Sequence, residues 1–369
     1  MKMRYLLVAL AMLLALPLTA QQSHRVEEYV NNINSKQRAY LSSTGIIIVG
    51  KAPKARAFSR FNGTTEMARY SIDCGNYYRT SLPQEVNVYL LLIPSAASYY
   101  TPDVAQRWIR SEASVMNAVY AGLDPKVKIV DAYSALAKHV EEDIYSRTDH
   151  HWAPLGGYYT AEVLAREAGV PFRDLSNYER VVVPNYVGSM YSFSKDESIR
   201  LSPETFVYHK PRDIEYETTY ISYSLASNRR TIVGESRPTK GEYFFNYKGS
   251  MAYCNFMSRD NRVTQVRTAT KNGRRMLIIK DSFGNAIPGY LFYTFEEIHV
   301  VDFRFFNKNL KKYIEDNGYE LISGGFERIP NVDLKDVPAE ARVILDKLTC
   351  AVETGRYKGK SKSSSGVFG

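Results

Sequence analysis

The stretch EVNVYLLLIP, residues 85–94, decides the fold class of this chain. Its apolar residues form a nearly continuous run, without regular alternation with polar residues, and a proline ends it. A strand that is apolar on both faces is normally covered on both sides, as in a parallel sheet with helices on its two faces. The run therefore predicts a buried strand of an α/β protein.

The segments on either side of this run continue the same pattern. Residues 103–123, DVAQRWIRSEASVMNAVYAGL, predict a helix, and residues 126–136, KVKIVDAYSAL, predict a strand that leads into a second helix. Upstream, residues 26–41 fit a short helix, and GIIIVG, residues 45–50, fits another buried strand. This order of strand, helix and strand indicates βαβ units.

The middle of the chain has a different character. Residues 176–270 are rich in Tyr, Ser, Arg and Asn and contain only short alternating segments, such as YERVVVPNYVG at 178–188 and TTYISYSL at 218–225. They predict an antiparallel or irregular, β-rich insertion that covers the sheet edge or builds one wall of a cleft. The α/β pattern resumes with RRMLIIKDSFGNAIPGYLFYTF at residues 274–295.

The two ends of the chain differ from its body. Residues 1–21 have the basic start, the apolar run of 14 residues and the small residues that are typical of a signal peptide. The run is shorter than the ~20 residues of a spanning helix, and an uncleaved membrane anchor is the alternative. Residues 355–369 predict a flexible basic tail. We therefore expect an exported protein, periplasmic or on the cell surface, whose main domain covers residues 22–354.

Composition and charge narrow the classes of protein. A chain of 369 residues with 44% hydrophobic and 24% charged residues is typical of a globular protein with a sizeable core. Much of the net charge of +9 lies at the two ends of the chain, with two positive residues in the signal and four in the tail. The small net charge that remains on the body argues against nucleic acid as its partner. Cys74, Cys254 and Cys350 have no CxxC spacing. The sequence therefore allows either one disulfide with one free thiol or three thiols.

A candidate nucleophile follows the strand at 276–279. In MLIIKDSFGNA, residues 276–286, Ser282 comes just after the apolar run and before a helical pattern. Active sites of open α/β sheets lie at the carboxyl ends of strands, and the N–H groups at a helix start can stabilise an oxyanion. The alternative is that Asp281 or Ser282 only caps the helix.

A serine nucleophile needs a base, and TDHHW at residues 148–152 supplies one. Alternate residues of an extended segment point the same way, so Asp149 could orient His151, and His151 could take the proton of Ser282. His150 is then expected to face away, as a packing or substrate contact. A metal site at Asp149, His150 and His151 is the weaker interpretation, because adjacent histidines converge poorly on one ion and no further ligand stands out.

TDHHW and IIKDSFGNA together resemble the DHHW proteins, which are relatives of the alginate O-acetyltransferases with an SGNH-hydrolase-like domain. The resemblance covers about residues 45–324 and includes further blocks: LLLIPSAASYYTP, VKIVDAYSALAKH, YVGSMY and IHVVDFRFFN. It implies a three-layer, flavodoxin-like parallel sheet with an inserted region. It also implies that Asp149, His151 and Ser282 form a triad-like catalytic set.

The chain departs from the SGNH pattern at two places. Lys280-Asp281-Ser282 replaces Gly-Asp-Ser, and there is no Gly-x-Asn-Asp block for the oxyanion hole. Asn285 is a weak substitute, beside the backbone donors at Ser282. Arg147 and Arg304 could hold an anionic sugar or a phosphate, although ordinary surface arginines explain them as well. The candidate substrate-binding residues are thus Arg147, His150, Trp152, Asn285 and Arg304.

These features predict a serine-dependent enzyme that transfers an acyl group, such as acetyl, to an exported polysaccharide or cell-wall sugar. A carbohydrate esterase (deacetylase) is the near alternative, because only the acceptor differs. A non-catalytic exopolysaccharide-binding or assembly protein is the alternative of another class. We expect no cofactor and no metal. The family resemblance suggests a membrane-bound O-acyltransferase as the source of the acyl group.

Overall fold

The computed structural model describes residues 24–225, 227, 232–306, 308–318 and 320–324. The predicted signal peptide at 1–21, the predicted tail at 355–369 and Cys350 lie outside these ranges. Among the described residues, no helix combines the length and the apolar character that crossing a membrane requires. Cys74 and Cys254 form no disulfide with each other.

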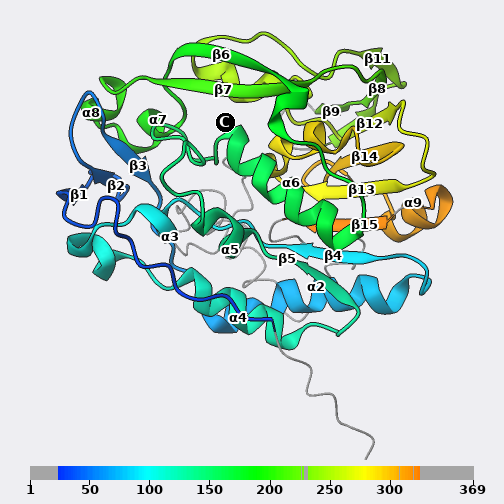
Figure 1. Ribbon diagram of the computed structural model, residues 1–369, viewed down its shortest axis with the longest axis horizontal. Coiled ribbons are helices and arrows are strands. Elements are labelled where there is room, and N and C mark those ends of the chain that lie inside the picture. The colour runs from blue at the N-terminus through cyan, green and yellow to red at the C-terminus, as the bar shows by residue number, and fades with distance from the viewer. Residues whose placement is uncertain (1–23, 226, 228–231, 307, 319, 325–369) are drawn as a thin grey trace, which may run out of the picture.

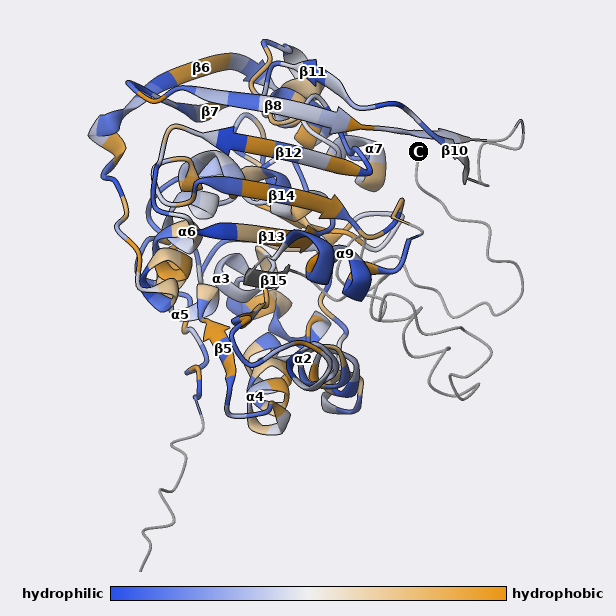
Figure 2. Cartoon of the chain, turned by 90° about the vertical axis from the view of Figure 1, so that its right-hand side faces the viewer, coloured by the Kyte–Doolittle hydropathy of each residue, from blue (hydrophilic) through white to orange (hydrophobic). Residues whose placement is uncertain are grey.

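An eight-stranded mixed sheet organises the protein (Figures 1 and 2). Its strand order is β11-β8-β12-β14-β13-β15-β4-β5. In that order the strands are Thr239–Gly241, Tyr216–Ile221, Val263–Thr268, Glu297–Asp302, Arg275–Lys280, Glu320–Gly324, Val88–Leu91 and Val127–Val130.

The sheet is parallel on one side only. The neighbours from β14 through β13, β15 and β4 to β5 pair in parallel. In contrast, β12 pairs antiparallel with both β14 and β8, and β8 pairs antiparallel with β11. A parallel sheet was therefore the wrong description for the whole. The antiparallel strands come from within the predicted insertion, where short connections favour antiparallel neighbours.

Three smaller β units lie outside this sheet. Strands β1, β2 and β3 form an antiparallel sheet, β6 and β7 form a long hairpin, and β9 pairs with β10. In Figure 1 the β6–β7 hairpin runs across the top and β1–β3 lie at the left. Their bounds are Ala39–Leu41, Ile47–Val49, Arg56–Phe58, Tyr178–Tyr186, Glu204–Pro211, Tyr223–Leu225 and Ile232–Glu235.

The helices connect and cover the strands. Helix α2 packs against β4 and β5, and α6 packs against β5. The α-helices are α2 Arg69–Ser81, α3 Ala97–Tyr100, α4 Glu112–Gly122, α5 Ala132–Ala137, α6 Pro154–Ala168, α7 Met190–Ser194, α8 Glu197–Arg200 and α9 Leu310–Asn317. The 3-10 helices are η1 Thr65–Ala68, η2 Asp103–Trp108, η3 Leu175–Asn177, η4 Gly249–Asn255, η5 Ser282–Ala286 and η6 Pro288–Leu291.

Two sequence predictions of local structure were wrong. Residues 26–41 form no helix; they contain bends and a turn at residues 33–37 and end in β1. The Asn31 side chain accepts the amides of Ile33 and Asn34 and so competes with a helical backbone. The expected helix at 103–123 is split into η2 and α4, and Ser111 caps the second part through the Ser114 amide. The predicted strands within 85–94 and 276–279 are present as the buried strands β4 and β13, and residues 126–136 form the predicted strand and helix start as the partly buried β5 and as α5.

Candidate active site

Ser282 stands directly after β13, as the first residue of η5. Asp281 is the cap of this turn: its Oδ1 accepts the Phe283 amide at 2.9 Å, and its carbonyl accepts the Gly284 amide at 3.2 Å. The capping role therefore belongs to Asp281, and the Ser282 hydroxyl is available for another partner. Within the described part of the chain, the Ser282 amide N–H has no hydrogen-bond acceptor.

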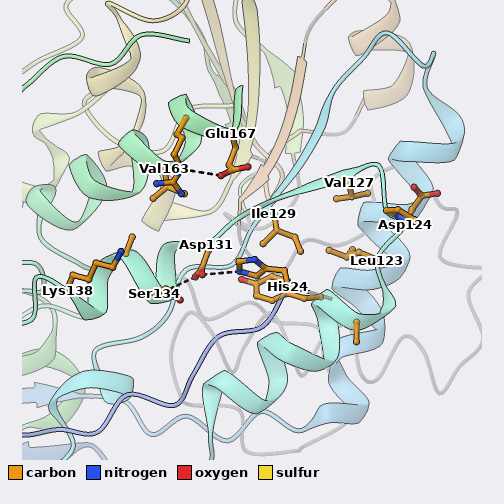
Figure 3. A pocket seen from close by; sticks show the side chains of 15 residues that line it. His24, Leu123, Asp124, Val127, Ile129, Asp131, Ser134, Lys138, Val163 and Glu167 are labelled. Atoms are coloured by element: carbon orange, nitrogen blue, oxygen red, sulfur yellow. Dashed lines mark hydrogen bonds and ion pairs between the residues drawn. The ribbon is translucent and has the colours of Figure 1, made fainter. Parts of the chain in front are cut away.

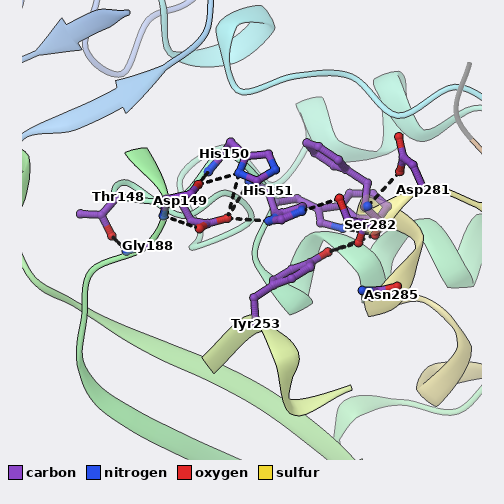
Figure 4. Close-up of polar contacts among 12 residues, drawn as sticks. Thr148, Asp149, His150, His151, Gly188, Tyr253, Asp281, Ser282 and Asn285 are labelled. Carbon is purple, nitrogen blue, oxygen red and sulfur yellow. Dashed lines mark hydrogen bonds and ion pairs between the residues drawn. The ribbon is translucent and has the colours of Figure 1, made fainter. Parts of the chain in front are cut away.

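The structure brings Ser282, His151 and Asp149 together in one line (Figure 4). His151 Nε2 lies 2.8 Å from Ser282 Oγ, and His151 Nδ1 lies 2.6 Å from Asp149 Oδ1. Asp149 and His151 are nearly buried, with 6% and 8% of their surfaces exposed. An ionised Asp149 places the proton on Nδ1, so Nε2 is free to accept the serine proton. This arrangement has the geometry of a nucleophile, a base and an orienting carboxylate.

The Asp149 carboxylate is held in its ionised form. Burial raises the pKa of Asp149, but His151, His150 and the Ser189 amide together bring it well below its ordinary value. Ser189 N–H donates to Asp149 Oδ2 at 2.8 Å. Gly188 lies against the same carboxyl, and a Cβ at that position would come within 2.7 Å of Asp149 Cγ. The YVGSMY block of the sequence is therefore the cradle of Asp149.

Glu204 on β7 anchors the turn that carries the histidines. Its Oε2 accepts the Arg147 amide at 2.8 Å, and its Oε1 accepts the amide and the hydroxyl of Thr148 at 2.7 and 2.6 Å. The Arg147 guanidinium donates to the carbonyls of Ala55 and Pro203. Arg147 thus ties the turn to its neighbours, and its guanidinium is not directed at Ser282.

His150 does not face away from His151, as an extended segment would require. Residues 147–151 are bent, and the two histidine rings lie 3.7 Å apart between centroids. His150 Nδ1 is 2.6 Å from Ser189 Oγ. Burial lowers the pKa of His150 to about 3, and the neighbouring His151 adds to this effect. His150 is therefore neutral at physiological pH.

Two aromatic residues fix the backbone that carries the serine. Trp152 is fully buried, and its Nε1–H donates to the Phe283 carbonyl at 2.9 Å, so it serves as a brace and not as a surface for substrate. The Tyr253 hydroxyl donates to the carbonyls of Ser282 and Phe283 at 3.0 and 3.1 Å. Tyr253 could not be predicted from the sequence, because one tyrosine among 29 has no local signal.

A charged cluster lies behind the serine turn. Arg304 contacts Asp302 Oδ2 at 2.6 Å and Asp260 Oδ2 at 2.8 Å, and the Lys280 ammonium contacts Asp302 at 3.0 Å. Asn285 Nδ2 donates to Asp260 Oδ1 at 3.1 Å. Burial raises the pKa of Asp260, but Lys280, Arg304, Asn285 and His151 together bring it well below its ordinary value. Arg304 and Asn285 are thus engaged with acidic partners next to the site.

A metal ion could also use the donors of this turn. One ligand atom each from Asp149, His150 and His151 lie within 4.8 Å of one another. However, His151 Nδ1 and Asp149 Oδ1 are bonded to each other, so an ion bound between them would replace the contact that orients His151. The donors are therefore already arranged for a triad.

Cavities differ in their relation to Ser282. A small one of about 30 Å³ borders His150 and Phe283, and Phe58, Ile93 and Glu112 line its other sides. A larger groove of about 520 Å³ lies elsewhere, between α4, α5, α6 and the edge strand β5 (Figure 3). None of the three triad residues lines either cavity, but the small one borders His150 and Phe283, the sequence neighbours of His151 and Ser282.

The chain was compared with known proteins. A family model described as DHHW protein matches residues 31–301. The crystal structure of a DHHW family protein from Eubacterium siraeum has 33% sequence identity and a TM-score of 0.69, and the match covers 78% of this chain and 92% of that chain. The structure of Bacillus cereus PatB1 with a sulfonyl adduct has 18% identity and a TM-score of 0.58, over 76% and 93% of the two chains, which shows likeness of fold alone.

A match of another kind is local. A probable transcriptional regulatory protein of Porphyromonas gingivalis is 51% identical over 47 residues, which are 13% of this chain. The chain spans only about a fifth, 19%, of the length of that curated relative. The match therefore carries no activity over to this chain.

Proposed function

This chain belongs to the DHHW protein family, and we propose that it is a serine-dependent acyl-transfer enzyme acting on a polysaccharide or a cell-wall sugar. One observation carries the proposal: the contacts of 2.8 and 2.6 Å that link Ser282 to His151 and His151 to Asp149. A serine hydroxyl is a weak nucleophile until a base takes its proton. The geometry supports that step without rearrangement.

The reaction runs in two halves. Ser282 Oγ attacks the carbonyl carbon of the acyl donor while its proton moves to His151 Nε2. The bond to the leaving group then breaks, the leaving group takes the proton from His151, and the acyl group remains as an ester on Ser282. A sugar hydroxyl next attacks this ester, gives its proton to His151, and Ser282 recovers a proton as it leaves.

The surrounding groups support the charges that develop. Asp149 stabilises the imidazolium form of His151 in each half-reaction. The Ser282 amide N–H is a donor for the oxyanion, since Asp281 already occupies the amides of Phe283 and Gly284. We propose that a membrane-bound O-acyltransferase supplies the acyl group, on the family association.

The proposal is tested by covalent labelling. The protein is exposed to p-nitrophenyl acetate and, separately, to a fluorophosphonate, and its intact mass is measured. We expect one adduct on the wild type, none on Ser282→Ala and a greatly slowed reaction in His151→Ala. Ser176→Ala, which removes an exposed serine from η3, is the matched control and should label as the wild type does.

Two further outcomes separate the alternatives. If added oligosaccharide accelerates loss of the acetyl adduct and itself becomes acetylated, the enzyme is a transferase; if water alone removes the adduct, it is an esterase. If neither reagent labels Ser282 in the folded wild type, the proposal is wrong, and oligosaccharide binding without acyl chemistry is the function to pursue.

A further inference from the structure

Tyr253 touches both halves of the candidate active site. Its ring stacks on the His151 imidazole, with centroids 3.9 Å apart and planes inclined by 6°. Its hydroxyl donates to the backbone carbonyls of Ser282 and Phe283. Figure 4 shows the Tyr253 ring below His151 and its hydroxyl directed at the serine turn. Tyr253 comes from η4, inside the inserted region, and is 6% exposed.

The stacking contact restrains a motion that the hydrogen bonds of His151 leave open. Those bonds hold the ring at its two nitrogens, which define a line from Asp149 to Ser282. The ring can still tilt about that line. The parallel ring of Tyr253 opposes this tilt on one face of the imidazole. The His150 ring lies on the other side (Figure 4), with its centroid 3.7 Å from that of His151.

The hydroxyl of Tyr253 restrains the other half. It is the donor to the Ser282 carbonyl, whereas the Phe283 carbonyl also receives Trp152 Nε1–H. Burial holds the pKa of Tyr253 well above its ordinary range, so the hydroxyl remains a donor throughout the working pH range. The two contacts of Tyr253 thus link the ring of His151 to the backbone that carries Ser282.

We propose that Tyr253 is a positioning residue that joins His151 to the serine turn and whose ring face stabilises the imidazolium formed when Ser282 loses its proton. This inference rests on the proposed function. An aromatic face attracts a cation, and the imidazolium is the cation of this reaction. The groups that face His151 from other directions are Asp149 and His150 on its own turn and Asp260 from the charged cluster.

Two substitutions separate the ring from the hydroxyl. Tyr253→Phe keeps the stacking and removes the hydrogen bonds, and Tyr253→Leu removes both. Tyr220→Phe is the matched control: Tyr220 is a buried tyrosine of β8 whose hydroxyl also donates to a backbone carbonyl, that of Glu242, away from the site. The readouts are the acylation rate with p-nitrophenyl acetate, the split between kcat and KM, the pH–rate profile and the urea unfolding curve.

For Tyr253→Phe we expect acylation to slow by roughly 3- to 10-fold, from the loss of a hydrogen bond, with the pH–rate profile unmoved. For Tyr253→Leu we expect a loss on the order of 100-fold in kcat with little change in KM. The acid limb of its profile should also move down by about half a pH unit, because the imidazolium loses its aromatic neighbour. Tyr220→Phe should match the wild type in rate.

Other results overturn the inference. If both Tyr253 variants acylate at the wild-type rate while Ser282→Ala does not react, Tyr253 has no positioning role and the proposed function stands. If Tyr253→Leu slows only in proportion to its unfolded fraction, with an unmoved pH profile, its role is purely structural and the inference is wrong. If the folded wild type is not acylated at all, the proposed function fails and this inference fails with it.

Discussion

Replacing Gly188 by alanine should disable the site without touching any reacting atom. The added Cβ would lie 2.7 Å from Asp149 Cγ, and closer still to its Cβ and Oδ2, whereas ordinary contact begins at 3.4 Å. The carboxyl group must therefore move by about 0.7 Å, which exceeds the ~0.5 Å within which a catalytic arrangement is normally held. Such a shift breaks the 2.8 Å bond from the Ser189 amide and displaces Asp149 from His151.

A displacement of this size costs on the order of 100-fold in rate, and the added methyl group should lower the free energy of unfolding by about 1–3 kcal/mol. The assay is the burst of p-nitrophenol on acylation, followed beside urea unfolding so that rate and stability are read separately. Gly234→Ala is the control, since the nearest heavy atom to its Cβ is 3.8 Å away. If folded Gly188→Ala acylates within twofold of the wild type, the account of the Asp149 cradle is wrong.

Three further predictions follow from the same geometry. Asp149→Asn should lower kcat/KM by roughly 10³- to 10⁴-fold, because the imidazolium loses its carboxylate; a loss below tenfold in a pH-resolved assay would contradict this. His150→Gln should flatten the pH dependence of stability. The pKa of His150 is about 3 in the folded state and 6.5 in the unfolded state, so the wild type loses stability as the pH falls through that interval. Urea titrations at several pH values test this, and parallel plots of stability against pH for the two proteins would refute it. Arg304→Gln should lower the free energy of unfolding by about 3 kcal/mol, because it removes a partner from the fully buried Asp302. An unchanged urea midpoint would contradict this and would show that Lys280 alone balances the charge of Asp302.

The parallel half of the sheet could be predicted because its signal is local. Strands β4 and β13 are apolar on both faces, and that composition is sufficient to indicate burial between layers. The antiparallel half carried no comparable signal. Strands β8 and β12 are half-polar, and the direction in which such strands pair depends on connections and contacts distant in sequence. The helix predicted at residues 26–41 is absent for a related reason, since the Asn31 side chain accepts backbone amides that a helix would have used otherwise.

The site divides in the same way. Ser282 follows the end of β13 and His151 precedes α6, so motif and position together indicated them, and the structure brings them within hydrogen-bond distance. Whether they catalyse a reaction stays a prediction. The orientation of His150 could not be predicted, because it depends on a bend in residues 147–151. Tyr253 and Glu204 were missed because they reach the site from the inserted region, and only the tertiary fold brings them there.

Strand β15 lies between β13 and β4, so the middle of the sheet joins residues 320–324 to residues 88–91. The ribosome synthesises β4 and β15 at widely separated times. A nascent chain that stops before residue 320 already contains the aspartate, the histidine and the serine, yet lacks the strand that joins the sheet's two portions. We therefore expect the growing polypeptide to remain catalytically inactive until residues 320–324 have been added.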